Sequence, residues 1–515
     1  MKKLIFLLIF VLLACETADD VVREATIEVP PPTVVVSVPV TEVVSDPIYP
    51  DDPVRELTIL YTNDEHGWME GVREGLGAAN LVGTWRNQFG YEPGLDSYLL
   101  LSGGDMWTGP AISTWFEGEG MVEVMNQMGY TAAAIGNHDF DFGLEALRAR
   151  ATEANFPFLS ANTRRTSDGQ VPTEWGIEPF VVVESNGVRV GIIGLTTTRT
   201  RTTTNPANIV DFEFIDYETA VREFLPEAQA QGAELFIVIG HLCEFEMRDL
   251  AARIPDLPVA IIGGGHCNEL FAEEQDGAIL LAGGSHMATF AGANLTFDTS
   301  TDELLSADYG TDYTDDRVTE NEAVAAVVAR WQAQTDEELE VVIGYTEAGF
   351  EQRSAEQQAL ITETWLWAMP TAVIALTNMG GFRADLRAGE ITFGDVVGVF
   401  PFNNVLVSVE LTGAQIVTLL TRSNEQLAVG GLGEVHGRWF LHKTGEVLED
   451  DTTYTVLVND FMYAGGSGFG RLAEWDPAGY NTAVDWRQPL IDWLVAQDSS
   501  PSETVDAAVG EWLER

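Results

Sequence analysis

The chain has 515 residues, more than one ordinary domain needs, so two or more domains are expected. Hydrophobic residues make up 45% of the sequence, which is enough to build buried cores. The 80 acidic and 27 basic residues give a net charge of −53. This charge argues against a nucleic-acid polymer as a partner, because phosphate backbones require a basic surface.

The first residues have the features of a targeting segment, which we predict over residues 1–14. Lys2 and Lys3 precede an apolar run that is shorter than the roughly 20 residues needed to cross a bilayer. Leu12-Leu-Ala-Cys15 then resembles a bacterial lipobox, in which the cysteine is lipidated. We therefore expect an extracytoplasmic protein anchored at Cys15 to a bacterial membrane, in the periplasm or at the cell surface. An ordinary secretory signal with a chance cysteine is the alternative.

Residues 15–54 are rich in Val, Pro, Thr and acidic residues, which is typical of an extended tether. From residue 55 to about 310, short β-like runs alternate with helical patterns, which indicates a layered α/β or α+β domain. A helical period over residues 318–340 predicts a connecting helix, and a second domain is expected over residues 341–515. The strands expected in the first domain are Leu57–Thr62, Ser97–Ser102, Ala132–Ile135, Phe180–Val183, Val188–Leu195, Leu235–Ile239, Val259–Ile262 and Ile279–Leu281.

Asp64 and His66 directly follow the first expected strand, in the stretch Tyr61-Thr-Asn-Asp-Glu-His-Gly67. In extended chain, residues i and i+2 point to the same side, so the carboxylate and the imidazole are expected to project together. This pair can form half of a site for a divalent metal ion. Taken alone, it is equally typical of a polar strand end.

Four further strand ends repeat the same order of an apolar strand, a tight glycine turn and a side chain able to bind metal. They carry Asp105, then Asn137, His138, Asp139 and Asp141, then His241, and finally His266 and Asn268. Any one of these motifs is more often a turn, a helix cap or a hydrogen-bonded histidine. Five of them together are not expected by chance.

Carboxylate oxygens and imidazole nitrogens suit zinc, manganese, iron or cobalt. The strand ends offer more ligands than one four-coordinate ion can use, and a carboxylate can bridge two ions. The sequence therefore predicts a site for two divalent ions lying about 3.5–4 Å apart. Among these metals we expect Zn, Mn or Co.

The order D-x-H, G-G-D, G-N-H-D, G-H and G-G-H resembles the calcineurin-like metallophosphoesterases. Asn137-His-Asp-Phe-Asp141 and Phe156-Pro-Phe-Leu-Ser-Ala-Asn162 are similar to the 5′-nucleotidase branch, whose bacterial members include periplasmic UDP-sugar hydrolases. The resemblance implies an α/β (α+β) fold: a four-layer metallophosphoesterase β-sandwich flanked by helices, then a smaller α/β substrate-binding domain. It also implies hydrolysis of nucleoside 5′-phosphates to nucleoside and phosphate by attack of a metal-bound water.

The resemblance assigns ligands to both ions. One ion is expected to be held by Asp64, His66, Asp105 and Asn268, and the other by Asp105, Asn137, His241 and His266, with Asp105 bridging. Asn268 stands where this branch usually has glutamine, so the amide is kept but shortened. His138 is expected to stabilise the phosphoryl group or protonate the leaving oxygen, and Asp141 to orient His138. His286 lies in a motif that borders the site in this family.

Cys243 and Cys267 follow the ligand histidines by two residues and one residue. They can pair in an oxidising compartment, line the site, or simply be buried, which is the commoner fate of cysteine. The sequence does not choose among these alternatives.

Three loops of the second domain also resemble the 5′-nucleotidase branch: Leu376-Thr-Asn-Met-Gly-Gly-Phe-Arg383, Val399-Phe-Pro-Phe-Asn-Asn404 and Val458-Asn-Asp-Phe-Met-Tyr-Ala-Gly-Gly-Ser-Gly-Phe469. In the family this domain recognises the nucleoside of a small-molecule nucleotide. By position, Phe402 and Phe469 are expected to sandwich the base, although core packing is the alternative for both. The other expected contacts to substrate are Arg353, Asn378, Gly380, Gly381 and Arg383.

Met379, Asn403 and Ser467 depart from the family pattern in this domain, which bears on the choice of nucleotide. Other chemistries on the same frame are therefore alternatives: a 2′,3′-cyclic-nucleotide phosphodiesterase, a UDP-sugar hydrolase or, on the strength of Gly103-Gly-Asp-Met-Trp107, a thiosulfohydrolase-like enzyme. A non-catalytic binding lipoprotein is the alternative of a different class. The oligomeric state is left open.

Overall fold

The computed structural model describes residues 52–73, 75–422 and 427–514. The predicted signal peptide, Cys15 and the predicted tether up to residue 51 lie outside the described residues, and strand β1 begins at Val54. In the part of the chain that the structure describes, no helix is both long enough and apolar enough to cross a membrane.

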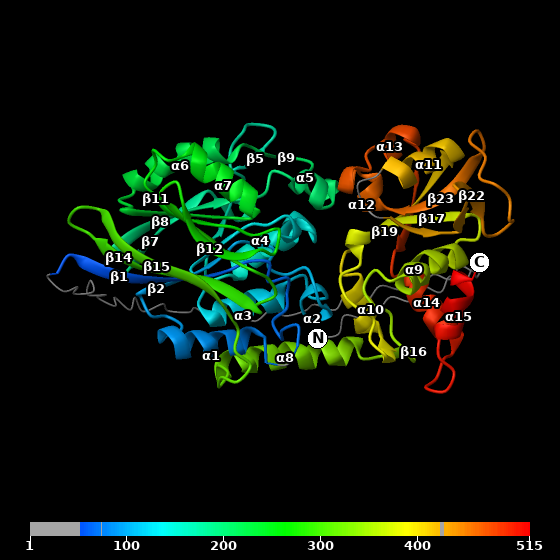
Figure 1. Cartoon of the computed structure of the whole chain (residues 1–515), viewed down its shortest axis with the longest axis horizontal. Helices are drawn as coiled ribbons and strands as arrows, with labels where there is room; N and C mark the ends of the chain where they lie inside the picture. Colours follow the sequence, from blue (N-terminus) through cyan, green and yellow to red (C-terminus); the bar gives the residue numbers. More distant parts are fainter. Residues whose placement is uncertain (1–51, 74, 423–426, 515) are drawn as a thin grey trace, which may run out of the picture. The chain divides into compact units, whose positions relative to one another are not determined.

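The N-terminal lobe, which we define as residues 54–313, is built on two β-sheets (Figure 1). The first sheet has the strand order β15-β14-β1-β2-β3-β4-β6, and the second has the order β12-β13-β11-β10-β8-β7. The strands of the first sheet are β15 (Glu303–Tyr313), β14 (Thr289–Asp298), β1 (Val54–Thr62), β2 (Tyr98–Ser102), β3 (Ala132–Ala134), β4 (Phe158–Leu159) and β6 (Ile177–Glu178). Those of the second are β12 (Leu270–Gln275), β13 (Ala278–Gly283), β11 (Val259–Gly263), β10 (Leu235–Gly240), β8 (Val188–Leu195) and β7 (Phe180–Ser185).

One apolar core lies between the two sheets, because its buried residues come from both; they include Ile59, Leu101, Ile192, Ile237 and Leu281. Strand β10 is apolar along its length and buried at every position, as expected of a parallel strand that is covered on both faces. The outer faces pack against helices through a second core. The lobe is therefore a four-layer helix–sheet–sheet–helix sandwich, which confirms the predicted fold class.

Helices α1, α3 and α8 lie on one outer side of the sandwich, and α6 and α7 lie on the other (Figure 1). Helix α8 falls within the predicted helical segment, and its N-cap Asn321 accepts hydrogen bonds from the backbone N–H groups of Ala323 and Val324. The helices of this part are α1 (Ala78–Phe89), α2 (Ala111–Thr114), α3 (Glu119–Met128), α4 (Gly143–Glu153), α5 (Thr200–Thr203), α6 (Tyr217–Ala230), α7 (Glu244–Arg253) and α8 (Glu322–Leu339). A small pair, β5 (Thr163–Arg165) and β9 (Phe212–Phe214), completes it.

The C-terminal lobe, residues 342–514, is built on a five-stranded sheet with the order β20-β17-β23-β19-β24. Its strands are β20 (Leu427–Gly430), β17 (Ile374–Asn378), β23 (Thr453–Asn459), β19 (Val405–Thr412) and β24 (Tyr480–Asp485), with the pairs β16 (Val342–Thr346) and β18 (Gly389–Thr392), and β21 (Leu432–Val435) and β22 (Arg438–Leu441). Helices α9 (Ala355–Ala368), α10 (Phe393–Val399), α14 (Gln488–Gln497) and α15 (Asp506–Leu513) share the apolar core on one face. Helices α11 (Gly413–Arg422), α12 (Asp460–Tyr463) and α13 (Arg471–Trp475) belong to the other face.

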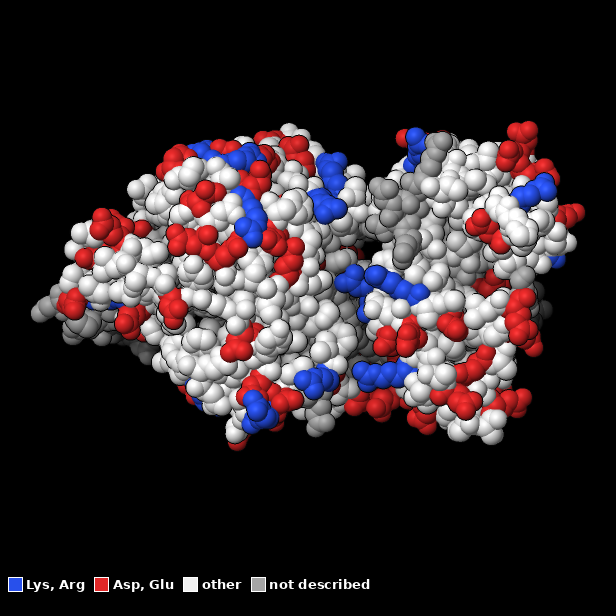
Figure 2. Space-filling model, viewed as in Figure 1, with Lys and Arg blue, Asp and Glu red and all other residues white. Residues whose placement is uncertain are grey.

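Acidic side chains are spread widely over the face of the protein shown in Figure 2. Basic side chains are sparser there, as the 80 acidic and 27 basic residues of the chain lead one to expect. A surface of this kind keeps a protein soluble through repulsion between like charges.

Candidate metal centre and substrate cavity

Five parallel strands of the N-terminal lobe end at the candidate metal centre. In the first sheet, β1, β2 and β3 are parallel neighbours, and in the second sheet β10 and β11 are parallel neighbours. The carboxyl ends of parallel strands share one edge of a sheet, which is where ligand sites of α/β proteins are found. The loops after these strands carry Asp64 and His66, Asp105, Asn137 and His138, His241, and finally His266 and Asn268.

Two groups of potential ligands lie close together, and they share Asp105. Asp64, His66 and Asp105 form one group, and Asp105, His241 and His266 form the other, with the ligand atoms of each group within 4.8 Å of one another. His241 Nε2 lies 3.0 Å from Asp105 Oδ2, and His66 Nε2 lies 3.8 Å from the same oxygen. Asp105 therefore stands between the two groups, where a carboxylate can bridge two cations.

The hydrogen bonds of two imidazoles prepare them to bind a cation. His66 Nδ1 lies 2.8 Å from the carbonyl oxygen of Thr108, and His241 Nδ1 lies 2.9 Å from that of Gly103. Each Nδ1–H therefore donates to a carbonyl, which directs each Nε2 toward the carboxylates. This arrangement fixes the tautomer and orientation of metal-binding histidines. The chain's own residues thus fit divalent ions.

Positive charge is favoured at His241. Burial opposes protonation of its imidazole, but the carboxylate of Asp105 outweighs burial and raises the pKa of His241 to about 10. His241 Nε2 also lies only 3.2 Å from Nδ1 of His266, so two ring nitrogens face each other. A cation between them would satisfy both nitrogens and Asp105 together, and it would replace the proton.

Asn137 offers a free oxygen at the same place. Its side-chain nitrogen donates to the carbonyl of Thr203 at 3.0 Å, whereas its Oδ1 is buried and has no hydrogen-bond partner among the described residues. A buried oxygen without a donor requires an explanation, and a bound cation supplies one.

Several of the candidate ligands adopt left-handed backbone conformations that L-residues rarely adopt. The φ angles are 50° at Asp64, 48° at His66, 60° at Asp105, 72° at His266 and 55° at Asn268. Strained backbone of this kind gathers at functional sites, where the surrounding structure imposes it. Asn268 is exposed.

Two supporting residues of the metal centre were not assigned a role from the sequence. Asn63 donates to Asp64 Oδ2 at 2.7 Å and to the carbonyl of Gly284 at 2.7 Å. Asp139 accepts hydrogen bonds from the backbone N–H groups of Asp105 and Met106 at 3.0 and 2.8 Å. Both residues belong to the quoted motifs, but their side chains face the protein, which local sequence does not show.

His138 and Asp141 form a pair beside the two ligand groups. His138 Nδ1 lies 2.7 Å from Asp141 Oδ2, and Asp141 Oδ1 accepts a hydrogen bond from Thr204 Oγ1 at 2.8 Å. Burial lowers the pKa of His138, but the carboxylates of Asp141 and Asp105 outweigh burial and leave the pKa above its usual value. The protonated imidazole is thereby favoured, and in that form it can donate a proton or a hydrogen bond.

Cys243 and Cys267 form a disulfide bond, with their Cα atoms 5.2 Å apart. Of the alternatives that the sequence left open, the structure selects pairing. The bond connects the loop that carries His241 to the loop that carries His266 and Asn268.

A cavity of about 430 Å³ opens from the metal centre toward the C-terminal lobe. Its walls contain most of the predicted residues: His66, Asp105, Asn137, His138, Asp141, His266, Asn268, Asn378, Gly380, Gly381, Arg383 and Phe402. Arg383 reaches His66 Nε2 at 3.4 Å and lies over the ring of Phe402, 5.8 Å from its centroid. The Phe402 ring is also 5.6 Å from the His138 ring. An aromatic face and a guanidinium thus stand beside the candidate catalytic histidine.

Phe469, expected to contact the base together with Phe402, does not line this cavity, and Phe461, which was assigned no role, does. Phe469 is instead buried in the core of the C-terminal lobe, whereas Phe461 lies at the start of α12. Asn459 fixes this turn, because its side chain donates to Asn378 Oδ1 at 2.9 Å and accepts from Met462 N at 2.8 Å. The sequence signal for Phe461 was its place in Asn459-Asp-Phe at the end of β23, because the candidate metal ligands also follow strand ends.

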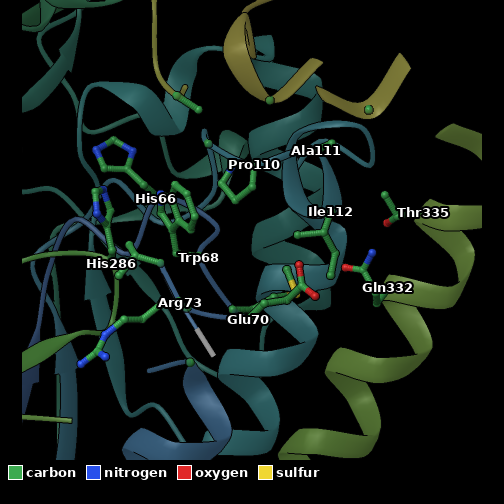
Figure 3. A pocket seen from close by; sticks show the side chains of 18 of the residues that line it. His66, Trp68, Glu70, Arg73, Pro110, Ala111, Ile112, His286, Gln332 and Thr335 are labelled. Atoms are coloured by element: carbon green, nitrogen blue, oxygen red, sulfur yellow. The ribbon is translucent and has the colours of Figure 1, made fainter. Parts of the chain in front are cut away.

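A second, larger cavity of about 1220 Å³ meets the first one at His66, Asn268 and Arg383. Arg353 and His286 line this larger cavity rather than the smaller one. At one end His66, Trp68 and His286 lie together, while Gln332 and Thr335 come from helix α8 (Figure 3). The ring of Trp68 lies 5.4 Å from that of His286.

Comparison with known proteins identifies close architectural relatives. Residues 342–474 match the family model described as the 5′-nucleotidase C-terminal domain. The chain is 27% identical to protein UshA of Escherichia coli over 520 residues, which cover 88% of this chain and 93% of UshA. It is 26% identical over 84% of its length to the trifunctional nucleotide phosphoesterase YfkN of Bacillus subtilis, but spans only 33% of that longer protein.

The crystal structure of a 5′-nucleotidase precursor from Thermus thermophilus superimposes on this chain with a TM-score of 0.73. The two are 26% identical, and the match covers 86% of this chain and 97% of the Thermus chain. The shared architecture, together with the strand-end ligands, leads to one assignment. Residues 342–474 match the 5′-nucleotidase C-terminal domain, and the similarity along most of the chain supports its assignment to the 5′-nucleotidase family.

Proposed function

We propose that the protein hydrolyses nucleoside 5′-phosphates to nucleoside and inorganic phosphate, with two divalent ions at the strand-end centre. The observation that carries this proposal is the sharing of Asp105 between two ligand groups next to a nucleotide-sized cavity. When bound, the two ions supply Lewis acidity, and they lower the pKa of water, which is the nucleophile. Their positive charge also offsets the negative charge of the whole chain near an anionic substrate.

The chain's own residues complete the reaction. Asp64, His66, Asp105 and Asn268 would hold one ion, and Asp105, Asn137, His241 and His266 would hold the other. Protonated His138 lies beside both groups and would donate to the phosphoryl group or to the leaving oxygen, with Asp141 orienting its ring. Arg383 would bind phosphate oxygens, and Arg353 would approach them from the larger cavity.

The nucleoside would lie toward the C-terminal lobe. Phe402 and Phe461 both line the smaller cavity, and aromatic faces stack on any base. Asn378 ends strand β17, and Gly380 and Gly381 follow it; all three line the smaller cavity, where they can meet the polar edge of the base or the ribose.

Location outside the cytoplasm, with a lipid anchor at Cys15, forms part of this proposal. The Cys243–Cys267 disulfide supports an oxidising compartment, because disulfides form and persist there. Mass spectrometry of the mature N-terminus tests the anchor directly. A lipid-modified Cys15 is expected, and a Cys15→Ala variant should leave the membrane fraction.

Hydrolysis of nucleotide sugars is a second candidate function, favoured by the larger cavity. This cavity meets the metal centre at His66, and Trp68, Glu70 and Gln332 line it further along (Figure 3). A group attached to the far side of the phosphate could lie there, with its apolar face on Trp68 and its hydroxyls on polar side chains.

Phosphate release from a substrate panel tests the proposal. Nucleoside monophosphates, a 2′,3′-cyclic nucleotide, a nucleotide sugar and p-nitrophenyl phosphate are compared with Mn, Zn and Co, each with and without a chelator. We expect activity on monophosphates that is lost on chelation. We expect Asp105→Asn to lower kcat by at least about a thousandfold, because it weakens both ion sites.

Asp302→Asn is the matched control for Asp105→Asn, because Asp302 lies in the exposed turn between β14 and β15. Full activity after removal of all metal would contradict the mechanism. Preference for the nucleotide sugar over every monophosphate would favour the second candidate function.

A further inference from the structure

We propose that the Cys243–Cys267 disulfide positions two metal-binding residues, His266 and Asn268, and thereby sets the affinity of the site for its ions. The inference rests on the proposed metal centre. Cys267 lies between His266 and Asn268 in the chain, and the proposed centre uses these two neighbours as ligands of different ions. The disulfide therefore attaches the middle residue of the His266–Asn268 segment, whose two end residues are proposed to bind different ions.

The partner of Cys267 is a firm anchor. Cys243 is fully buried, and it precedes helix α7, where its backbone N–H donates to Glu246 Oε2 at 3.1 Å. It follows the central strand β10 by three residues, and β10 is a parallel neighbour of β11, from which the Cys267 loop emerges. The disulfide therefore joins an exposed loop to the rigid interior of the N-terminal lobe.

The His266–Asn268 segment needs such an anchor more than the other ligands do. Cys267 and Asn268 are exposed, and His266 and Asn268 both have left-handed φ angles, 72° and 55°. L-residues leave this conformation readily unless the surroundings impose it. Backbone hydrogen bonds hold the segment at its two ends: Gly265 N donates to the carbonyl of Leu242 at 2.8 Å, and Gly284 N donates to the carbonyl of Glu269 at 2.9 Å. Between these points His266 N donates to Asp64 Oδ2 at 2.9 Å, and the disulfide at Cys267 adds a covalent attachment to the turn itself.

The side chains of the three candidate ligand histidines also differ in how firmly they are held. His66 and His241 are each held by a backbone carbonyl at Nδ1. Among the described residues, His266 shows no such carbonyl contact, and its Nδ1 faces His241 instead. Without the disulfide, His241 would keep its place, whereas the turn that carries His266 and Asn268 would lose its covalent attachment and hold their side chains less firmly toward the ions.

The Cys243→Ser/Cys267→Ser double variant tests this inference. Dissociation constants for Mn²⁺ and Zn²⁺ are measured by competition with a chelating dye, in the absence of substrate. We expect them to rise about 10- to 100-fold, the size of effect seen when a support of a metal ligand is removed. We also expect kcat to return to within about threefold of wild type once both ions are saturating, because the ligands themselves are unchanged.

A matched control separates positioning from general stability. Phe297→Ala removes a buried side chain near the end of β14. Phe297 pairs with Arg55 near the start of β1, whereas the candidate ligands Asp64 and His66 follow the end of β1. Strand β14 itself carries none of the candidate ligands. This variant should lower the unfolding midpoint while leaving both metal dissociation constants within about twofold of wild type.

Unchanged dissociation constants in the serine variant would overturn the inference, whatever happens to its unfolding midpoint. Should the serine pair fail to fold, Cys243→Val/Cys267→Ser keeps an apolar group at the buried position and is measured in the same way. The proposed function fails separately: a protein that binds two ions but releases no phosphate from nucleotides refutes that function and leaves the metal-affinity test intact.

Discussion

At the residue scale, Phe402 and Phe461 are the two aromatic side chains of the C-terminal lobe's motifs that line the smaller cavity. Phe461 lies in the first turn of the short helix α12, and the N-cap residue Asn459 holds this turn against Asn378. Phe469, which the motif spacing had suggested, packs with Leu472 and Met462 in the core instead. The platform for the base is therefore expected to involve the first phenylalanine of this segment rather than the last.

Replacing Phe461 by alanine should weaken nucleotide binding specifically. Loss of base stacking is expected to raise KM for nucleoside monophosphates about 5- to 150-fold, because one stacked base contributes about 1–3 kcal/mol. The KM for p-nitrophenyl phosphate, which has no base, should change little. Phe469→Leu is the comparison variant; it should lower thermal stability and leave KM alone. A larger KM effect from Phe469→Leu than from Phe461→Ala would refute this placement.

Glu65 lies between Asp64 and His66 but faces the protein interior. It is fully buried, and its carboxyl receives hydrogen bonds from Thr62 Oγ1 at 2.5 Å and from Ser102 Oγ at 2.9 Å. Burial raises the pKa of Glu65 from 4.5 to about 8, even though these two hydroxyl groups lower it. In metal-free protein the folded state therefore keeps a proton on Glu65 that the unfolded chain releases.

The stability of the metal-free protein should accordingly fall as pH rises from 4.5 to about 8, because in this window the unfolded state binds fewer protons. Glu65→Gln carries a permanent neutral group and should flatten this part of the pH profile, so that it gains on wild type toward pH 8. Unfolding midpoints across the range measure the effect. Glu303→Gln, at an exposed position on β15, is the control and should keep the wild-type slope.

At the element scale, helix α8 is attached to the N-terminal lobe by its contact with α3. Trp331 of α8 is buried, and its Nε1 donates to Glu123 Oε2 of α3 at 3.0 Å. Its ring covers Gly120, where a Cβ atom would come within 2.9 Å of the ring. The glycine at this position thus provides the close approach of the two helices.

Gly120→Ala should destabilise the protein although alanine is the better helix former. The clash with Trp331 is expected to cost about 1–3 kcal/mol, which exceeds the gain of about 1 kcal/mol in helix propensity. In a Trp331→Leu background the same change should be neutral or stabilising, because the ring is gone. Denaturant unfolding of the four proteins of this cycle measures the coupling. Equal effects of Gly120→Ala in both backgrounds would show that the helix contact is not responsible.

At the scale of the whole molecule, the net charge of −53 is the dominant property. Like charges repel one another more strongly in the compact state than in the extended chain, which lowers stability. Salt screens this repulsion, with a Debye length that falls from about 30 Å at 0.01 M to about 10 Å at 0.1 M.

The thermal unfolding midpoint should therefore rise with NaCl, and most of the increase should come below about 0.2 M, where screening changes fastest. Scanning calorimetry of the metal-loaded protein from about 0.01 to 0.5 M NaCl measures this dependence. An increase that begins only at molar salt would indicate a general effect of salt on apolar burial instead. A falling midpoint would show that the ion pairs on the surface outweigh the repulsion.

The sequence by itself determined the chemistry of the candidate metal centre. Asp64, His66, Asp105, His241 and His266 stand out because each follows an apolar strand and a tight turn, and both features depend on neighbours in the chain. Their oxygen and nitrogen donors are properties of the side chains alone, whatever the fold. For the same reason the alternation of strands and helices was sufficient to predict the layered architecture.

Only the tertiary structure decided how these pieces meet. It showed that Asp105 stands between both ligand groups, that Gly103 and Thr108 orient the imidazoles, and that Cys243 pairs with Cys267. It also placed Phe461 rather than Phe469 at the cavity. Each of these facts depends on residues that are distant in the chain or on the direction of a side chain within a turn. Local patterns carry neither kind of information, because packing between distant segments settles both.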